Sequence, residues 1–237
     1  MKPAVIPQNE EERLKILNSY KILDTLPEED YDDIVKIASS ICNTPIALIS
    51  LVDKDRQWFK SKQGLNVSET PRDFAFCAHS ILNPDELLIV NDAKKDDRFS
   101  DNPLTTQDPN ITFYAGAPLK VSEDHAIGTL CVIDNKPNDL NQTQKDALKL
   151  LAKQIVSLLD LRKRNNELKN ANQKVVKLNE QLNNFAFRLT HDLKSPISGV
   201  NFLLDVLKED HIDLFKGTEA EKNINLISSR MIYMGTL

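Results

Sequence analysis

The distribution of proline and glycine divides this chain of 237 residues into two parts. Ten of its eleven prolines lie before residue 140, and neither proline nor glycine occurs between Asn138 and Ser195. Both residue types interrupt helices, so a long stretch that lacks them favours one extended helix. The sequence therefore predicts a compact domain in the N-terminal part and a long helical segment after it.

The N-terminal part alternates between helical and strand-like periodicity. Apolar residues recur every three or four positions over residues 10–20 and 28–42, as on the buried face of a helix. Further apolar or alternating segments are bounded by turn residues, as strands are: residues 46–52, 57–62, 87–90, 112–121 and 126–133. This order predicts an α+β domain in which helices cover a mostly antiparallel sheet.

Five motifs in this part resemble the GAF domains of bacterial signalling proteins. They are ISLVD at 49–53, QWFKS at 57–61, FCAHSI at 76–81, FYAGAPL at 113–119 and IGTLCVID at 127–134. The resemblance covers roughly residues 10–160 and implies a central antiparallel sheet flanked by helices, in a GAF sensory domain that we expect to span residues 1–157. GAF domains bind cyclic nucleotides, tetrapyrroles or other small molecules, and some bind none, so the ligand stays unknown.

Aromatic, cysteine and histidine side chains are the candidates for contact with such a ligand. We expect a pocket between the sheet and the helices, and we assign to it Trp58, Phe76, Cys77, His79 and Tyr114. The alternative is that these side chains belong to the core, which is the commoner fate of aromatic residues. Bilin-binding relatives attach their chromophore at a Cys-His pair, but here Ala78 separates Cys77 from His79, which argues against attachment.

A seven-residue apolar repeat begins near residue 158. Leu161, Leu168, Val175, Leu182 and Leu189 are seven residues apart, and Ala171, Leu178 and Phe185 occupy the companion position. This spacing, with charged residues and asparagines between, is typical of parallel coiled coils. We therefore expect a coiled-coil signalling linker over residues 158–184 that forms a homodimer. The alternative is a single surface helix that packs on its own domain.

The residues after this repeat resemble the phospho-accepting helix of sensor histidine kinases. The motif is FAFRLTHDLKSPI, residues 185–197. Imidazole, with a pKa of about 6.5, suits a nucleophile near neutral pH, and an adjacent carboxylate can hold the proton on its other nitrogen. The resemblance implies that His191 accepts a phosphoryl group, that Asp192 is the general base, and that Lys194 meets phosphate or an acidic partner. The alternative is that His191 is an ordinary surface histidine.

Ser195 and Pro196 complete the motif. The family often has threonine or asparagine at the position of Ser195, where it positions water for dephosphorylation, so the resemblance implies a phosphatase position there. Pro196 cannot donate a hydrogen bond to the Asp192 carbonyl, so we expect the helix to bend after the histidine. We expect residues 185–237 to form a truncated dimerisation and phosphotransfer hairpin, with a loop at 211–217 before a second helix.

The two resemblances together predict a fragment of a bacterial two-component sensor histidine kinase. A cytoplasmic signal at the GAF domain would control autophosphorylation of His191, and the phosphoryl group would pass to an aspartate on a response-regulator receiver domain. ATP and Mg²⁺ would be held by a kinase ATP-binding domain, whose glycine-rich loops this sequence lacks, so we expect the chain alone to be inactive. The alternative is a dimeric GAF–coiled-coil regulator that binds a ligand and has no kinase activity.

Composition and cysteine usage argue against other classes. The net charge is −5 and no basic stretch occurs, so we expect no nucleic-acid partner. No window approaches about 18 consecutive apolar residues and no signal peptide is recognisable, so we expect no membrane span and a cytoplasmic protein. Three cysteines without a C-x-x-C pair predict neither a disulfide framework nor a metal site. Some GAF-fold proteins reduce methionine sulfoxide with cysteines, but the spacing here matches no redox pair.

Overall fold

The computed structural model describes residues 1–235, apart from the side chains of residues 210–213, 215 and 235. The described chain divides into two units between Glu167 and Leu168. The first unit contains all the strands and the shorter helices of the N-terminal part. The second contains the C-terminal part of a long helix and one further helix.

The first unit is built on a six-stranded antiparallel sheet with the strand order β3-β2-β1-β6-β5-β4. Its strands are β1 (Ile46–Val52), β2 (Arg56–Gln63), β3 (Glu69–Pro71), β4 (Leu88–Val90), β5 (Phe113–Ser122) and β6 (His125–Asp134). The five strands expected from periodicity are confirmed to within one residue at each end. The sequence did not predict β3, because three residues without apolar alternation carry no strand signal.

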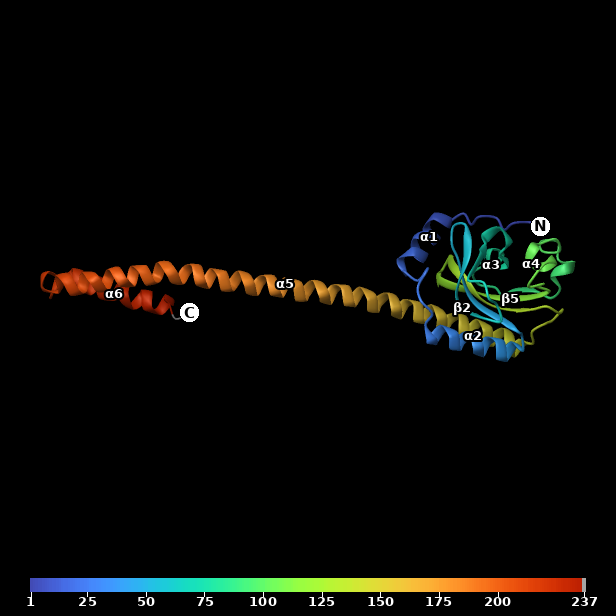
Figure 1. Cartoon of the computed structure of the whole chain (residues 1–237). Helices are drawn as coiled ribbons and strands as arrows, with labels where there is room; N and C mark the ends of the chain where they lie inside the picture. The colour runs from blue at the N-terminus through green and yellow to red at the C-terminus, as the bar shows by residue number, and fades with distance from the viewer. Residues whose placement is uncertain (236–237) are drawn as a thin grey trace. The chain divides into compact units, whose positions relative to one another are not determined.

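Helices cover both faces of this sheet. They are α1 (Glu10–Ser19), α2 (Glu29–Cys42), the 3₁₀ turn η1 (Arg72–Phe74), α3 (Phe76–Ser80), the 3₁₀ turn η2 (Ala93–Lys95), α4 (Pro103–Thr106) and the beginning of α5 (Gln142–Phe215). Figure 1 shows α2 and the beginning of α5 on one face, and α3 and α4 on the other. This confirms the predicted α+β GAF fold, an antiparallel sheet flanked by helices and followed by a long helix.

The two-sided cover explains why β1 is apolar at nearly every position. Successive side chains of a strand point to opposite faces, and β1 is buried along its whole length. Ala47 and Ile49 join the core with α2 and α5, whereas Ile46 and Leu48 join the core with α3. Gly128 on β6 is needed here, because a side chain at this position would collide with the backbone of β1.

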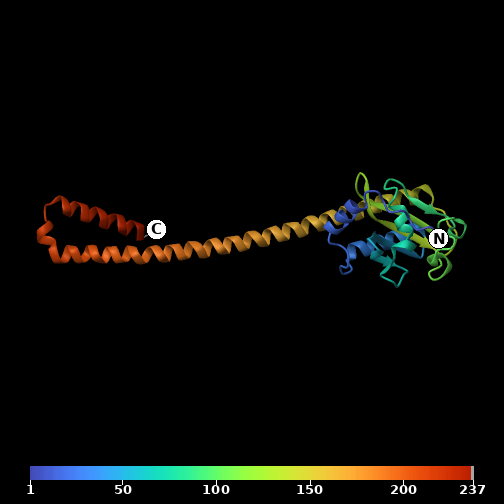
Figure 2. The same cartoon turned by 90° about the horizontal axis from the view of Figure 1, so that it is seen from above.

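The second unit is a helical hairpin. α5 ends at Phe215 rather than at the predicted residue 210, and Gly217 turns the chain with a φ of 76°. α6 (Glu219–Gly235) then folds back beside the end of α5 (Figure 2). Lys208 Nζ donates a hydrogen bond to Ser228 Oγ at 3.0 Å, which links the two helices.

α5 continues through Pro196 without ending. The proline removes one hydrogen bond, the one that the Asp192 carbonyl would accept, but the neighbouring turns keep the helix intact. Within residues 1–235, no helix combines the length and the apolar character that crossing a membrane requires.

Candidate functional site

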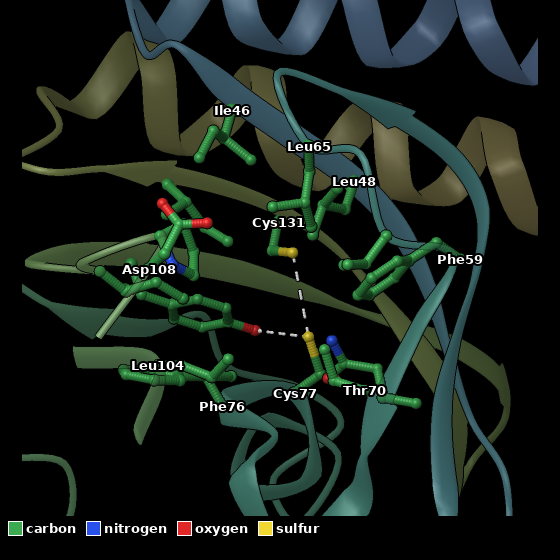
Figure 3. Close-up of a pocket in the computed structure, with 16 residues that line it drawn as sticks. Ile46, Leu48, Phe59, Leu65, Thr70, Phe76, Cys77, Leu104, Asp108 and Cys131 are labelled. Carbon is green, nitrogen blue, oxygen red and sulfur yellow. Dashed lines mark hydrogen bonds between the residues drawn. The ribbon is translucent and has the colours of Figure 1, made fainter. Parts of the chain in front are cut away.

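A cavity of about 130 Å³ lies between the sheet and the segments that cover its α3 face. Its walls are mostly apolar and comprise Ile46, Leu48, Gln57, Phe59, Leu65, Val67, Thr70, Phe76, Cys77, Leu104, Asp108, Pro109, Ile111, Tyr114, Cys131 and Ile133 (Figure 3). Cavities of about 150 Å³ hold a molecule of the size of benzene, whereas drug-sized ligands occupy roughly 300–1,000 Å³. The cavity in this conformation therefore suits a small molecule rather than a nucleotide or a bilin.

Two polar atoms in the walls lack a partner among the described residues. Gln57 Oε1 and Thr70 Oγ1 are buried and make no hydrogen bond. Buried polar groups are costly unless they are paired, so each of these atoms is a position where a ligand or a water molecule gains a hydrogen bond. Asp108 adds a carboxylate to the wall, on another side of the cavity from Thr70 (Figure 3).

A cluster of polar hydrogens surrounds the sulfur of Cys77. Cys77 comes from α3 and Cys131 from β6, and their Sγ atoms face each other at 3.8 Å (Figure 3). The Thr129 hydroxyl donates a hydrogen bond to Cys77 Sγ at 2.9 Å, and the Tyr114 hydroxyl donates another at 3.2 Å. Gly116 leaves the room that Tyr114 needs, because a Cβ there would collide with the tyrosine hydroxyl.

This environment separates the acidities of the two thiols. Burial raises the pKa of Cys77, but polar contacts with Cys131, Ser50, Thr129 and Tyr114 outweigh burial and lower this pKa to about 7. The pKa of Cys131 lies well above its usual value, because its thiol proton is shared with Cys77 and because it is buried. Cys77 is therefore the thiol that ionises first, and Cys131 keeps its proton.

The residues assigned to the ligand pocket from the sequence are only partly brought together. Phe76, Cys77 and Tyr114 line the cavity. Trp58 lies in the core on the α2 face of the sheet, and His79 contacts the Lys2 carbonyl at 3.1 Å instead. Neither of these two side chains lines the cavity.

Strand alternation identifies the residues that sequence reasoning missed on β2. Gln57 and Phe59 line the cavity, whereas Trp58 between them points to the other face. Cys131 lies two positions before Ile133 on β6, and both line the cavity for the same reason. Thr70 lies on the three-residue strand β3 and Asp108 in a loop, and neither segment is long enough or regular enough for periodicity to mark a side chain as inward.

A chain of charged groups joins β2 to α5 within the first unit. Lys60 follows Phe59 on β2, and its fully buried ammonium donates to Glu28 Oε1 at 2.6 Å and to the Leu26 carbonyl at 2.7 Å. Arg162 on α5 donates to the same Glu28 oxygen at 3.1 Å. Burial raises the pKa of Glu28, but Lys60 and then Arg162 outweigh burial and lower it, so the carboxylate stays ionised between the two cations.

The motif around His191 lies on α5 in the second unit, with its side chains in solvent. His191 and Asp192 are 77% and 79% exposed, and His191 Nδ1 lies 3.4 Å from Asp192 Oδ1. Lys194, Ser195 and Pro196 are exposed on the following turn. An imidazole whose Nδ1 faces a carboxylate leaves Nε2 free for an incoming group, which is the arrangement that a phosphoryl acceptor needs.

No metal centre is apparent in the described part of the chain. Among residues 1–235, no three histidine, cysteine, aspartate or glutamate side chains are grouped so that they can hold an ion. Cys77 and Cys131 lie beside each other, but among the described residues no third ligand joins them.

Comparison with known proteins places the cavity within a known domain type. A sequence model of the GAF domain family matches residues 27–159. A cyclic di-GMP phosphodiesterase of Pseudomonas aeruginosa is 43% identical over 131 residues, which are 55% of this chain and 22% of that protein. This chain therefore matches less than a quarter of the length of this relative.

Solved structures of GAF domains are also similar. The GAF domain of a phosphoenolpyruvate-protein phosphotransferase from Coxiella burnetii is 14% identical, with a TM-score of 0.49, and the match covers 68% of this chain and 99% of that one. A domain assigned to a two-component sensor histidine kinase protein from Sinorhizobium meliloti is 18% identical, with a TM-score of 0.46, and the match covers 60% of this chain and 97% of that one.

The curated relative contradicts one prediction from the sequence, that this chain is a protein histidine kinase. The name of that relative gives a cyclic di-GMP phosphodiesterase and not a kinase. The kinase prediction combined the resemblance to GAF domains with the motif at residues 185–197, and neither contains the loops that hold ATP and Mg²⁺. A histidine on a helix supplies a nucleophile, and a nucleophile alone does not identify an enzyme.

Proposed function

Since this chain belongs to the GAF domain family, we propose that residues 1–157 are a sensory domain that binds a small molecule and controls the helices after it. The observation that carries the proposal is the course of α5. Leu148, Ile155 and Leu159 of this helix are buried in the core of the sensory domain, and the same helix carries His191. No catalytic activity of its own is proposed for this chain.

The ligand that we propose is small, largely apolar and able to form hydrogen bonds at one end. The apolar walls of the cavity favour such a molecule, and Gln57 Oε1 and Thr70 Oγ1 await polar partners. The free thiols of Cys42, Cys77 and Cys131 suit a reducing compartment, so we place the domain and its signal in the cytoplasm.

We propose that β2 carries the signal from the cavity to α5. Phe59 lines the cavity, and the next residue, Lys60, holds Glu28, which in turn holds Arg162 on α5. A ligand that moves β2 changes the position of a fully buried ammonium group. Because a buried ammonium group is costly without its partner, a movement of Lys60 favours a matching movement of Glu28 and Arg162.

We propose that residues 158–184 dimerise as a parallel coiled coil. On the single chain, Leu168, Val175 and Leu182 are 70%, 64% and 61% exposed, and they repeat every seven residues. A second copy would bury this row, and burial of each such side chain is worth about 1.5–3 kcal/mol at most. In the hairpin over residues 185–237, Leu203, Leu207 and Leu226 are also exposed and would be buried in a four-helix bundle of two copies.

We further propose that His191 accepts a phosphoryl group from an ATP-binding domain that is not part of residues 1–237. His191 Nε2 attacks the phosphorus, the bond from phosphorus to the leaving oxygen breaks, and Asp192 holds the proton on Nδ1. Transfer from His191 to a receiver-domain aspartate then passes the signal on. Lys194 is placed to meet the phosphate, and Ser195 to orient water.

Phosphoryl transfer in trans tests this role. Incubation of the chain with a histidine kinase ATP-binding domain and labelled ATP should give an acid-labile, base-stable label on wild type, and His191→Gln should abolish it. Lys169→Gln, at an exposed position of the same helix and outside the motif, should keep the label. If several donor domains leave wild type unlabelled, or if His191→Gln is still labelled, the acceptor role is refuted.

A second candidate function is a dimeric regulator that binds a ligand and controls another type of output domain. It is favoured by the 43% identity of the segment shared with a cyclic di-GMP phosphodiesterase. In that case the cavity, β2 and α5 keep their roles, and His191 is an exposed surface residue. The same phosphorylation experiment distinguishes the two candidates, since only the first requires the label.

A further inference from the structure

We propose that Cys77 and Cys131 form a peroxide-responsive dithiol, in which a hydroperoxide oxidises Cys77 and Cys131 then closes a disulfide with it. The oxidant enters the same cavity as the proposed ligand, but the dimer and His191 play no part in this reaction. It assigns chemistry to a buried pair of thiols that the other functions of the domain leave unused.

The two sulfur atoms are within reach of a bond. They lie 3.8 Å apart, whereas a disulfide bond is about 2.05 Å long. Rotation about the Cα–Cβ bond of either side chain moves its sulfur atom and can bring the two sulfur atoms closer. The two residues come from different elements, α3 and β6, so a disulfide would join the helix that lines the cavity to the middle of the sheet.

The surroundings of Cys77 favour the thiolate, which is the reactive form. Hydroxyl groups of Thr129 and Tyr114 donate to its sulfur at 2.9 and 3.2 Å. A cysteine packed only among apolar groups has no such donors and stays protonated and unreactive. Two hydroxyl donors and a neighbouring thiol around one buried sulfur are therefore hard to explain by packing alone.

The cavity gives a small oxidant a place beside this sulfur. Cys77 and Cys131 both line it, and its volume of about 130 Å³ admits a hydroperoxide. Both cysteines are at most 2% exposed, so bulky or charged oxidants have no direct access to them. We therefore assign the oxidant to the class of small, uncharged hydroperoxides.

The chemistry balances in two steps. Cys77 thiolate attacks the terminal oxygen of the hydroperoxide, the O–O bond breaks, and the departing alkoxide takes up the proton that Cys77 has lost. Cys77 is then a sulfenic acid, oxidised by two electrons. Cys131 Sγ next attacks Cys77 Sγ, the S–OH bond breaks, and the departing hydroxide leaves as water with the Cys131 proton. Two thiols and one hydroperoxide thus give a disulfide, an alcohol and water.

Cys42 provides a control within the same domain. It is buried like the pair, but no other sulfur lies beside it, and burial alone raises its pKa to about 11. Burial by itself therefore predicts equally low reactivity at Cys42 and Cys77. The proposal predicts that only Cys77 reacts.

Peroxide titration of the reduced full chain tests the proposal. After treatment with hydrogen peroxide, the protein is unfolded in an alkylating reagent, and each cysteine is quantified by peptide mass spectrometry. We expect a Cys77–Cys131 disulfide within each chain, while Cys42 is oxidised at least about tenfold more slowly. If Cys77 is oxidised no faster than Cys42, or if its disulfides join separate chains, the proposal is wrong.

Variants test the order of the two steps. With Cys131→Ser, oxidation should stop at a sulfenic acid on Cys77 that dimedone traps, whereas Cys42→Ser should behave as wild type. If a variant does not fold, the comparison of Cys77 with Cys42 in wild type still decides the question. Because neither experiment involves His191 or dimerisation, failure here leaves the proposed function untouched, and the reverse also holds.

Discussion

At the scale of single residues, the acidity of Cys77 has a consequence for the stability of the fold. The folded domain releases the Cys77 proton near pH 7, whereas a thiol in an unfolded chain does so near pH 9. Between these values the unfolded chain binds more protons than the folded one, so stability rises with pH. The stabilisation by the Cys77 thiolate is complete above the pKa of this thiol in the unfolded chain. It is lost as the pH falls through about 7, the pKa of Cys77 in the folded domain.

We predict that the free energy of unfolding of the reduced protein rises by about 1–3 kcal/mol between pH 7 and pH 9. Above pH 9 it should fall again, because the pKa values of Cys42 and Cys131 are raised by folding and their thiols ionise first in the unfolded chain. Urea denaturation with a reductant at several pH values measures both the rise and the fall of the free energy of unfolding. Cys77→Ser should remove the rise and Cys42→Ser should keep it. A wild-type curve that is flat over this interval would contradict the assigned acidity.

Single residues also show which features of the site could not be predicted from the sequence. A motif that includes Trp58 and Phe59 locates β2, and alternation places the two side chains on opposite faces of the sheet. Only the structure shows that Phe59 is the one that faces the cavity. The proximity of Cys77 and Cys131 was not predictable, because 54 positions separate them in the sequence. Their contact arises from the docking of α3 on the sheet, which no local pattern encodes.

At the scale of elements, long periodic segments were predictable and short ones were not. β1 and α2 have the bounds expected from periodicity, to within one residue. β1 is buried on both faces and leaves an unbroken apolar run, whereas α2 is buried on one face and leaves apolar residues every three or four positions. α3 and α4 have five and four residues, too few to show a helical period. The end of α5 was misplaced because the residues after 210 continue the helix without an early glycine.

The exposed apolar row of α5 yields a prediction at this scale. In a parallel dimer with matching register, residues at position d of the heptad lie next to their counterparts. Position d is the companion position that Ala171, Leu178 and Phe185 occupy. Leu178→Cys should therefore form a disulfide between two chains under mild oxidation, and Lys177→Cys, which points away from the partner, should not. Non-reducing electrophoresis measures both yields, and the native cysteines contribute little because all three are buried. Equal cross-linking of the two variants would argue against this coiled coil.

At the scale of the whole molecule, one helix joins the two parts: α5 begins in the core of the sensory domain and also carries His191. The sequence was sufficient to predict this order of parts, because the segment from the domain to His191 contains neither proline nor glycine, the residues that break helices. It was not sufficient to identify an enzyme, since the motif around His191 only resembles that of a phosphoryl acceptor and contains no loop that binds ATP. The contact through which we propose that the domain controls α5, Glu28 with Arg162, joins residues 134 positions apart and was visible only in the structure.

The rate of His191 phosphorylation in a variant of this contact tests the central claim most directly. A separate ATP-binding domain supplies labelled phosphate to wild type, to Arg162→Gln and to Lys169→Gln, which removes the same charge from an exposed position of the same helix. If the GAF domain controls His191 through α5, Arg162→Gln should change the initial rate by about threefold or more, and Lys169→Gln should leave it unchanged. Equal rates for all three proteins would contradict the account.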